Sequence, residues 1–99
     1  MDIKKELNGD ELKVTVSGRL DTTTAPTLEE ELKSSIDGIK KLVIDFKDWG
    51  YISSAGLRVL LVMQRIMNKQ GEMLVTDVNE TVMDIFEVTG FSDILTIGK

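Results

Sequence analysis

Two adjacent serines, Ser53 and Ser54, are the side chains of this sequence whose type and position could carry a specific chemistry. They follow an apolar run at Lys41–Phe46 and precede a long helical pattern, so they stand where a strand would pass into a helix. A helix start leaves backbone N–H groups unpaired and carries roughly half a positive charge, which favours a side-chain oxygen or a phosphate there. We expect the small residues Ala55 and Gly56 to leave this first turn open to another molecule. From the local pattern alone, the simpler interpretation is that one serine serves only as a helix N-cap.

The composition argues against most kinds of catalysis. The chain has no histidine and no cysteine, so it lacks the imidazole of a serine triad, the usual zinc ligands and the usual general base near neutral pH. We therefore expect no catalytic residue, no metal and no cofactor, and we predict that the protein is not an enzyme. The two serines are then acceptors or contact residues and not hydrolytic nucleophiles.

The length and the net charge of the chain limit the classes of protein to which it could belong. The 99 residues suffice for one domain with a modest core, which we place at 1–99. A net charge of −5 argues against direct binding to nucleic acid, because phosphate neutralisation needs a concentrated basic surface. The polar N-terminus has no apolar leader segment, and no apolar run is long enough to cross a bilayer. These features predict a cytoplasmic protein without membrane insertion.

The first segment predicts an antiparallel hairpin. Apolar residues alternate with polar ones in Leu12–Val16, and Ile3–Leu7 precedes them across Asn8-Gly9, a dipeptide typical of tight turns. The chain is then expected to leave the sheet through Gly18–Asp21 and a run of three threonines. Thr24 would be the N-cap of a helix that ends before Gly38.

The rest of the chain predicts alternating strands and helices. Lys41–Phe46 has little polar surface on either face, which suits a central strand. In the connection that follows, we expect Tyr51 to be buried, while Trp49 could be buried or exposed. A helix, a strand, a last helix and a short strand or tail are then expected over Leu57–Gln70, Glu72–Thr76, Asn79–Gly90 and Ile94–Ile97. The predicted fold class is α/β, a small mixed β-sheet of four to five strands with helices packed on it.

The segment around the two serines resembles the signature of a known family. Tyr51–Leu57, followed by Val59–Leu61, looks like the phosphorylation turn of the STAS-domain anti-sigma factor antagonists of bacteria. Gly18–Asp21 is similar to that family's Gly-x-Leu-Asp segment, and Gly71–Met73 to its Gly-Gly-Glu-Met segment. The resemblance extends over nearly the whole chain and implies a single STAS domain.

The match also assigns a modification site. Aligning Gly56 with the family's glycine places its phosphoacceptor on Ser54, with Ser53 as the second choice. The chain departs from the family pattern around this position: Ser53 replaces the usual aspartate, Ala55 the second hydroxyl residue, and Arg58 a small residue.

The resemblance implies a function in partner switching. The unphosphorylated protein would bind an anti-sigma factor that is also a serine/threonine kinase, and this would free a sigma factor. Phosphorylation at Ser54 would release the antagonist, and a serine phosphatase would reactivate it. The loop before the first helix lies beside the phosphorylation turn in this family. The implied partner-binding residues are Asp21, Thr22, Thr23, Thr24, Ser53, Ser54, Ala55, Gly56, Leu57 and Arg58.

Three alternative interpretations remain. The chain could be a STAS module that is never phosphorylated and works as a scaffold in a transporter or signalling assembly. Asp45, at the end of a central strand, suggests a phosphoaspartyl receiver domain, but the acidic pair and the late lysine of such a domain are missing. A small enzyme is disfavoured because histidine, cysteine and a phosphate-cradling glycine loop are all lacking.

Overall fold

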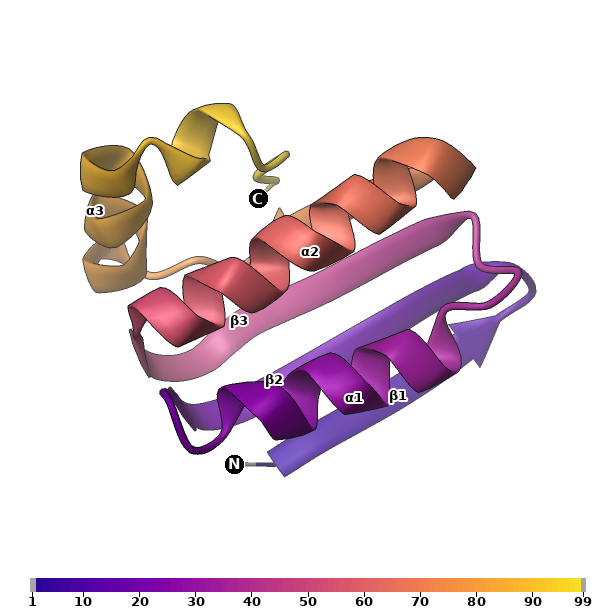
Figure 1. The fold of residues 1–99 in the computed structure, drawn as a ribbon, viewed down its shortest axis with the longest axis horizontal. Coiled ribbons are helices and arrows are strands. Elements are labelled where there is room, and N and C mark those ends of the chain that lie inside the picture. Colours follow the sequence, from indigo (N-terminus) through magenta and orange to yellow (C-terminus); the bar gives the residue numbers. More distant parts are fainter. Residues whose placement is uncertain (1, 99) are drawn as a thin grey trace.

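A four-stranded mixed sheet forms the centre of the molecule (Figure 1). The computed structural model describes residues 2–98, with the backbone alone described at positions 47–50. The strands follow one another across the sheet in chain order; they are β1 (Asp2–Asn8), β2 (Glu11–Leu20), β3 (Lys41–Ile52) and β4 (Glu72–Thr76). β1 and β2 are antiparallel, whereas β2, β3 and β4 run parallel to one another. The α/β class, the mixed sheet and the N-terminal hairpin are confirmed.

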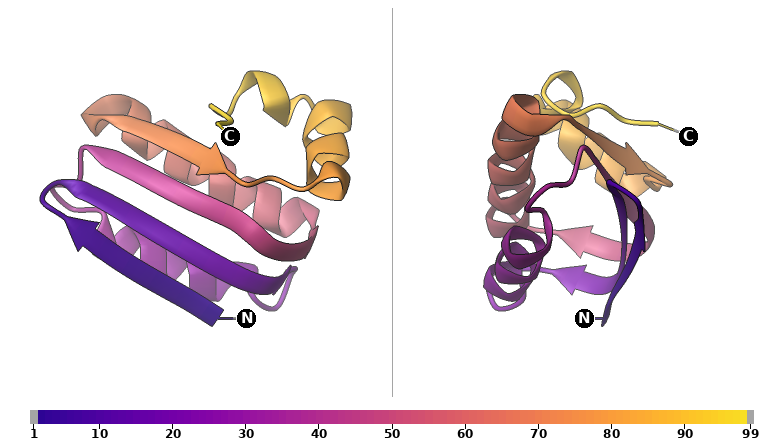
Figure 2. Two further views of the ribbon diagram at one scale, coloured as in Figure 1. Left: turned by 180° about the vertical axis from the view of Figure 1, so that it is seen from behind. Right: turned by 90° about the vertical axis from the view of Figure 1, so that its right-hand side faces the viewer.

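Two helices cover one face of this sheet. They are α1 (Ala25–Ser35) and α2 (Ser54–Gln70), which lie side by side in the end-on view of Figure 2. The shorter helix α3 (Glu80–Thr89) follows β4 and leads into a single helical turn, η1 (Phe91–Asp93). In the part of the chain that the structure describes, no helix is long and apolar enough to span a membrane.

The core lies between the sheet and the helices, as the periodicity predicts. The strand residues that alternate inward are buried; they are Leu12, Val14, Val16, Leu42, Ile44, Phe46, Met73 and Val75. They pack against buried residues of the helices, which include Leu28 and Leu32 of α1 and Leu60, Met63 and Met67 of α2. Phe46 and Phe86 meet edge to face with ring centroids 5.8 Å apart, which fixes α3 against β3.

The hairpin turn differs from its prediction by one position. Asn8 pairs with Glu11 as the last residue of β1, so the loop consists of Gly9 and Asp10 and not of Asn8-Gly9. Gly9 has a φ of 62°, a conformation that glycine adopts without steric cost. The glycine thus determines the turn, while the asparagine remains in the strand.

Two strands are longer than predicted. β2 continues through Gly18 to Leu20, and β3 continues to Ile52, so the segments expected to leave the sheet are still paired there. The pairing tolerates irregularities between Thr15 and Ser17 and next to Gly18, whose φ of 103° suits a bulge. Polar residues indicated an early exit, but one face of these strands carries no helix and can hold polar side chains.

The extension of β3 overturns the expectation for Tyr51. Its side chain is 40% exposed, and the Arg19 guanidinium lies 4.9 Å from the ring centroid, in cation–π contact across the paired strands. The prediction that Tyr51 is buried is therefore wrong. Trp49, for which burial and exposure were both open, lies among the side chains outside the described ones.

The ends of α3 follow their sequence signals closely, whereas the start of α2 differs from its prediction. The Asn79 side chain accepts a hydrogen bond from the Val82 N–H at 2.8 Å, and Gly90 ends α3 with a φ of 82°. α2 begins at Ser54 and not at the expected Leu57. Ile97 forms one parallel bridge with Val75, so the predicted strand or tail is a tail with a single bridge beside β4.

Candidate functional site

The ends of β2 and β3 bring the predicted site residues to one edge of the sheet. Leu20 pairs with Ile52, and the Ser53 N–H donates a hydrogen bond to the Leu20 carbonyl at 2.9 Å. Because these strands are parallel neighbours, the loop after β2 and the first turn of α2 emerge together. The carboxyl edge of parallel strands is also where open α/β sheets generally bind their ligands.

The two serines have different roles in the local structure. Ser53 is the N-cap of α2: its backbone is extended, and its Oγ accepts the Gly56 N–H at 3.4 Å. Ser53 is half-buried. Ser54 is the first residue of the helix, and it is exposed. The simple capping role that the sequence left open for either serine thus belongs to Ser53, and the exposed hydroxyl belongs to Ser54.

The small residues after the serines do not both open the first turn. Gly56 is buried, and a Cβ added there would lie 2.7 Å from Leu20 and 2.8 Å from Ile52. The glycine therefore lets α2 close onto the strand ends, and the expectation that it leaves space for another molecule is wrong. Leu57 is also buried, whereas Ala55 is only half-buried.

The loop before α1 is held together by one carboxylate. Asp21 Oδ1 accepts hydrogen bonds from the Thr23 hydroxyl at 2.7 Å and from the N–H groups of Thr23 and Thr24 at 3.0 and 3.1 Å. The Thr23 hydroxyl first, and then these N–H groups, hold the pKa of the Asp21 carboxyl below its ordinary value. The loop thus has a fixed shape without being buried.

Thr24 does not act as the predicted side-chain cap. It occupies the N-cap position of α1, but its backbone is helical and its side chain makes no capping bond. Its hydroxyl instead donates to the Arg19 carbonyl at 2.8 Å and accepts the Asp21 N–H at 2.9 Å. The Asp21 carboxylate accepts the N–H groups of Thr23 and Thr24 in this turn. The Thr24 hydroxyl is therefore available to connect the loop to Arg19 in β2.

A hollow of about 350 Å³ lies between the first turns of α1 and α2. It brings together three of the predicted partner-binding residues, Thr22 from the loop and Ala55 and Arg58 from α2. Sequence reasoning missed the rest of its lining, which consists of Ala25, Pro26, Glu29 and Val59. In the sequence, those residues look like ordinary helix-start or core residues, so nothing marks them as part of a hollow. The two helix starts lie side by side only because β2 pairs with β3.

Comparison with known proteins decides the family. The sequence model described as STAS domain matches residues 2–99. The chain belongs to the STAS domain family. The anti-sigma-B factor antagonist of Bacillus subtilis is 32% identical to this STAS chain over 98 residues, covering 98% of the chain and 88% of that protein. BtrV of Bordetella bronchiseptica is 37% identical over 86 residues, covering 85% and 74%. The resemblance to the STAS-domain anti-sigma factor antagonists is thereby confirmed.

Solved structures agree with the fold of this STAS domain. The anti-sigma factor antagonist SpoIIAA in its unphosphorylated form superposes with a TM-score of 0.84 at 15% identity, covering 99% of this chain and 89% of that one. Its phosphorylated form, described as a Bacillus cell fate determinant, superposes with a TM-score of 0.77 at 14% identity, covering 99% and 92%. At this identity the likeness concerns the fold alone.

The charges of the STAS site are of both signs and differ in how they are paired. Arg19 lies 3.9 Å from Asp21, and Lys33 lies 3.4 Å from Glu29. Arg58 is exposed at the hollow and forms no ion pair with any residue of the described part. Among residues 2–98 with described side chains, no group of three acidic side chains is placed to hold a metal ion.

Proposed function

We propose that this STAS chain is an anti-sigma factor antagonist that binds an anti-sigma factor serine/threonine kinase when unphosphorylated, and that phosphorylation of Ser54 releases it. The contrast between the two serines carries the proposal. Ser53 caps α2 with its hydroxyl and is half-buried, whereas Ser54 is exposed at the first helical position, directly before Ala55, which lines the hollow between α1 and α2. A kinase active site could reach Ser54 without disturbing the cap.

A phosphate on Ser54 is compatible with the fold. It would add about −1.5 to −2 charges at the positive end of α2, where an anion is stabilised by roughly 0.3 to 1 kcal/mol. The nearby cation Arg58 forms no ion pair with a described residue, so it could offset part of this charge. The modification should therefore change binding and not folding.

Release then arises at the interface. The proposed docking surface combines the loop Asp21–Thr24, the first turn of α2 and the hollow between them, so a bulky dianion on Ser54 would meet a partner shaped for a hydroxyl. Each 1.4 kcal/mol of repulsion or desolvation weakens binding about tenfold. A serine phosphatase would restore the hydroxyl and with it the affinity. Any effect on transcription passes through protein partners in the cytoplasm and not through direct contact with nucleic acid or insertion into a membrane.

The decisive experiment maps the modification. The purified chain is incubated with ATP and the anti-sigma factor kinase of its own cell, and the modified residue is located by peptide mass spectrometry. We expect one phosphate on Ser54 in wild type and in Ser53→Ala, and none in Ser54→Ala. A phosphate on Ser53 would move the acceptor to the second choice.

The intact mass of protein purified from its own cells tests the same proposal without a chosen kinase. A phosphorylated fraction is expected for a switch. If no fraction of the cellular protein carries phosphate and the kinase leaves it unmodified, the chain is instead a phosphorylation-independent STAS module.

A further inference from the structure

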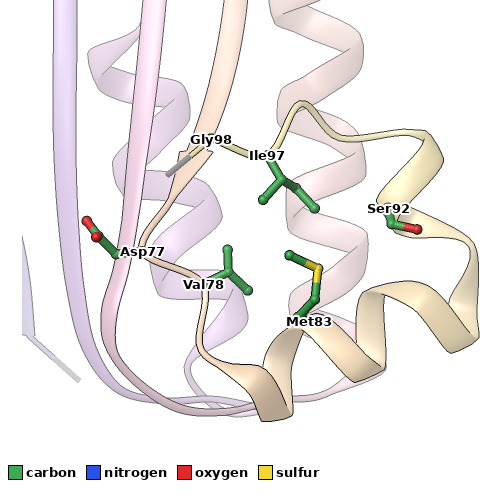
Figure 3. Close-up of a pocket in the computed structure, with 6 residues that line it drawn as sticks. All are labelled: Asp77, Val78, Met83, Ser92, Ile97 and Gly98. Carbon is green, nitrogen blue, oxygen red and sulfur yellow. The ribbon is translucent and has the colours of Figure 1, made fainter.

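A second hollow lies beside α3, and it shares no residue with the candidate site. It measures about 590 Å³, is open to solvent, and is bordered by the segment leaving β4, by α3, by η1 and by the tail; its lining residues are Asp77, Val78, Met83, Ser92, Ile97 and Gly98. Figure 3 shows the side chains of Val78, Met83 and Ile97 pointing towards one another across it, while the Asp77 carboxylate and the Ser92 hydroxyl point away. The interior of the hollow is thus apolar and its edge is polar.

The chain segment that supplies all the lining residues of this hollow, 77–98, carries charge of one sign. All ionisable side chains between positions 77 and 98 are acidic and exposed; they are Asp77, Glu80, Asp84, Glu87 and Asp93. No described residue forms an ion pair with any of them. Their formal charge equals the net charge of the whole chain, −5, so the remaining residues sum to no net charge. The negative field of the protein is therefore concentrated here.

The acidic side chains are placed where they can act together with the hollow. Glu80 and Glu87 lie three residues before and four residues after Met83 on α3, so they flank it on the same helical face. Asp77 lines the hollow, and Asp93 follows the lining residue Ser92. The Asp77 carboxylate points away from the hollow, so a ligand that inserts an apolar group between Val78 and Met83 would meet chiefly the carboxylates of Glu80 and Glu87 on α3.

From this combination we infer that the hollow beside α3 is a docking site for a segment of another protein that presents apolar side chains next to lysines or arginines, as a basic amphipathic helix does. The apolar side chains would occupy the hollow, and the cations would meet the unpaired carboxylates at its edge. A second copy of this chain fits less well, because two molecules that each carry a charge of −5 repel one another. The inference goes beyond the proposed function, because it needs neither Ser54 nor an anti-sigma factor.

A synthetic amphipathic peptide of lysine and leucine serves as the probe, added to isotope-labelled full-length chain and followed by NMR. We expect saturable shifts of the amide signals of Val78, Met83 and Ile97. A peptide of the same charge in which serine replaces leucine lacks the apolar anchors, and it should bind at least about tenfold more weakly. Equal affinity of the two peptides, or shifts centred on α1 and β1, would overturn the assignment.

Two variants of equal net charge distinguish binding at the hollow from attraction of the basic peptide by the net negative charge of the protein. In the first variant the carboxylates around the hollow are neutralised by Glu80→Gln, Glu87→Gln and Asp93→Asn. The control carries Glu6→Gln, Glu30→Gln and Asp37→Asn, which are also exposed and produce the same net charge. At low salt the first variant should bind the lysine–leucine peptide about tenfold more weakly than the control does.

Two results would contradict the inference at this stage. One is equal weakening in both variants, which would mean that net charge alone attracts the peptide. The other is a concentration-dependent dimer of the free chain in sedimentation that is abolished by Met83→Gln, which would assign the hollow to a second copy. Circular dichroism of each variant checks that its helices are retained.

Discussion

The two hollows of this molecule differ in how they are built. The hollow between the starts of α1 and α2 is held by the paired ends of two long strands and by the Asp21 loop, and its lining includes charges of both signs, Glu29 and Arg58. The hollow beside α3 is bordered on one side by a tail that has a single bridge to β4, and the ionisable side chains of the segment that lines it, 77–98, are all acidic. The first region is therefore the more extensively paired of the two, and the second has the more uniform charge.

The largest expected effect tests how tightly the first region is built. In Gly56→Ala the new Cβ would collide with the buried side chains of Leu20 and Ile52. Overpacking of this kind destabilises the folded state by about 1 to 3 kcal/mol. The higher helix propensity of alanine offsets about 1 kcal/mol of this loss. We expect the free energy of unfolding, measured by urea denaturation, to fall by up to about 2 kcal/mol.

The matched control lies in the second region. A Cβ at Gly98 would have its nearest contact, 3.0 Å, with the end of the half-buried Leu74 side chain, which can give way more easily. Gly98→Ala should therefore cost less than Gly56→Ala. Equal losses would mean that the tail is held as firmly as the strand ends, and the contrast between the two regions would fail.

The second prediction separates binding from folding at Ser54. We expect Ser54→Asp to weaken binding to the anti-sigma factor kinase at least about tenfold, as measured by calorimetry, while the free energy of unfolding changes by less than about 0.5 kcal/mol. The reason is that a carboxylate at the first turn of α2 suits the helix dipole but not a surface shaped for a hydroxyl. Ser54→Ala should bind like wild type and resist release by ATP. If Ser54→Asp unfolds far more easily and binding is lost only with the fold, the interface explanation is wrong.

The third prediction compares the N-caps of the two regions. The Asn79 side chain accepts its hydrogen bond at 2.8 Å, whereas Ser53 accepts at 3.4 Å, near the limit of such a bond. Asn79→Ala should therefore lower the free energy of unfolding by about 1 kcal/mol and Ser53→Ala by about 0.5 or less. Thermal unfolding of the two variants under the same conditions gives the comparison. A larger loss in Ser53→Ala would mean that its hydroxyl contributes more than the cap geometry indicates.

Periodicity and capping signals predicted most of the fold. The helices expected after Thr24 and over Leu57–Gln70 are present with buried apolar faces, and Asn79 and Gly90 marked the ends of α3. The ends of β2 and β3 were missed, because their pairing is a tertiary property. Arg19 and Tyr51 look like loop residues until the two strands are placed side by side.

At the candidate site the helix start was predicted, but the way in which the site is built was not. Ser53 and Ser54 were correctly placed at the start of a helix, but only the hydrogen bond to Gly56 distinguishes the cap from the exposed hydroxyl. The role of Gly56 was misjudged because the sequence does not tell which side of the helix meets the strands. Pro26 and Glu29 could not be assigned to the hollow from local patterns, since it depends on two helices far apart in the chain.

The smallest expected effect concerns the loop that shapes the first region. The pKa of Asp21 is lowered in the folded state, so its hydrogen bonds stabilise the protein at pH values above the ordinary carboxyl range, and this contribution is lost as the pH falls through the lowered pKa. Thr23→Val keeps the backbone donors but removes the hydroxyl that lowers this pKa most. NMR titration of the Asp21 side-chain carboxyl carbon should therefore show the pKa rising towards its ordinary value in Thr23→Val. An unchanged titration would mean that the backbone N–H groups alone hold the carboxylate, and that the loop owes its fixed shape to the main chain and not to the threonines.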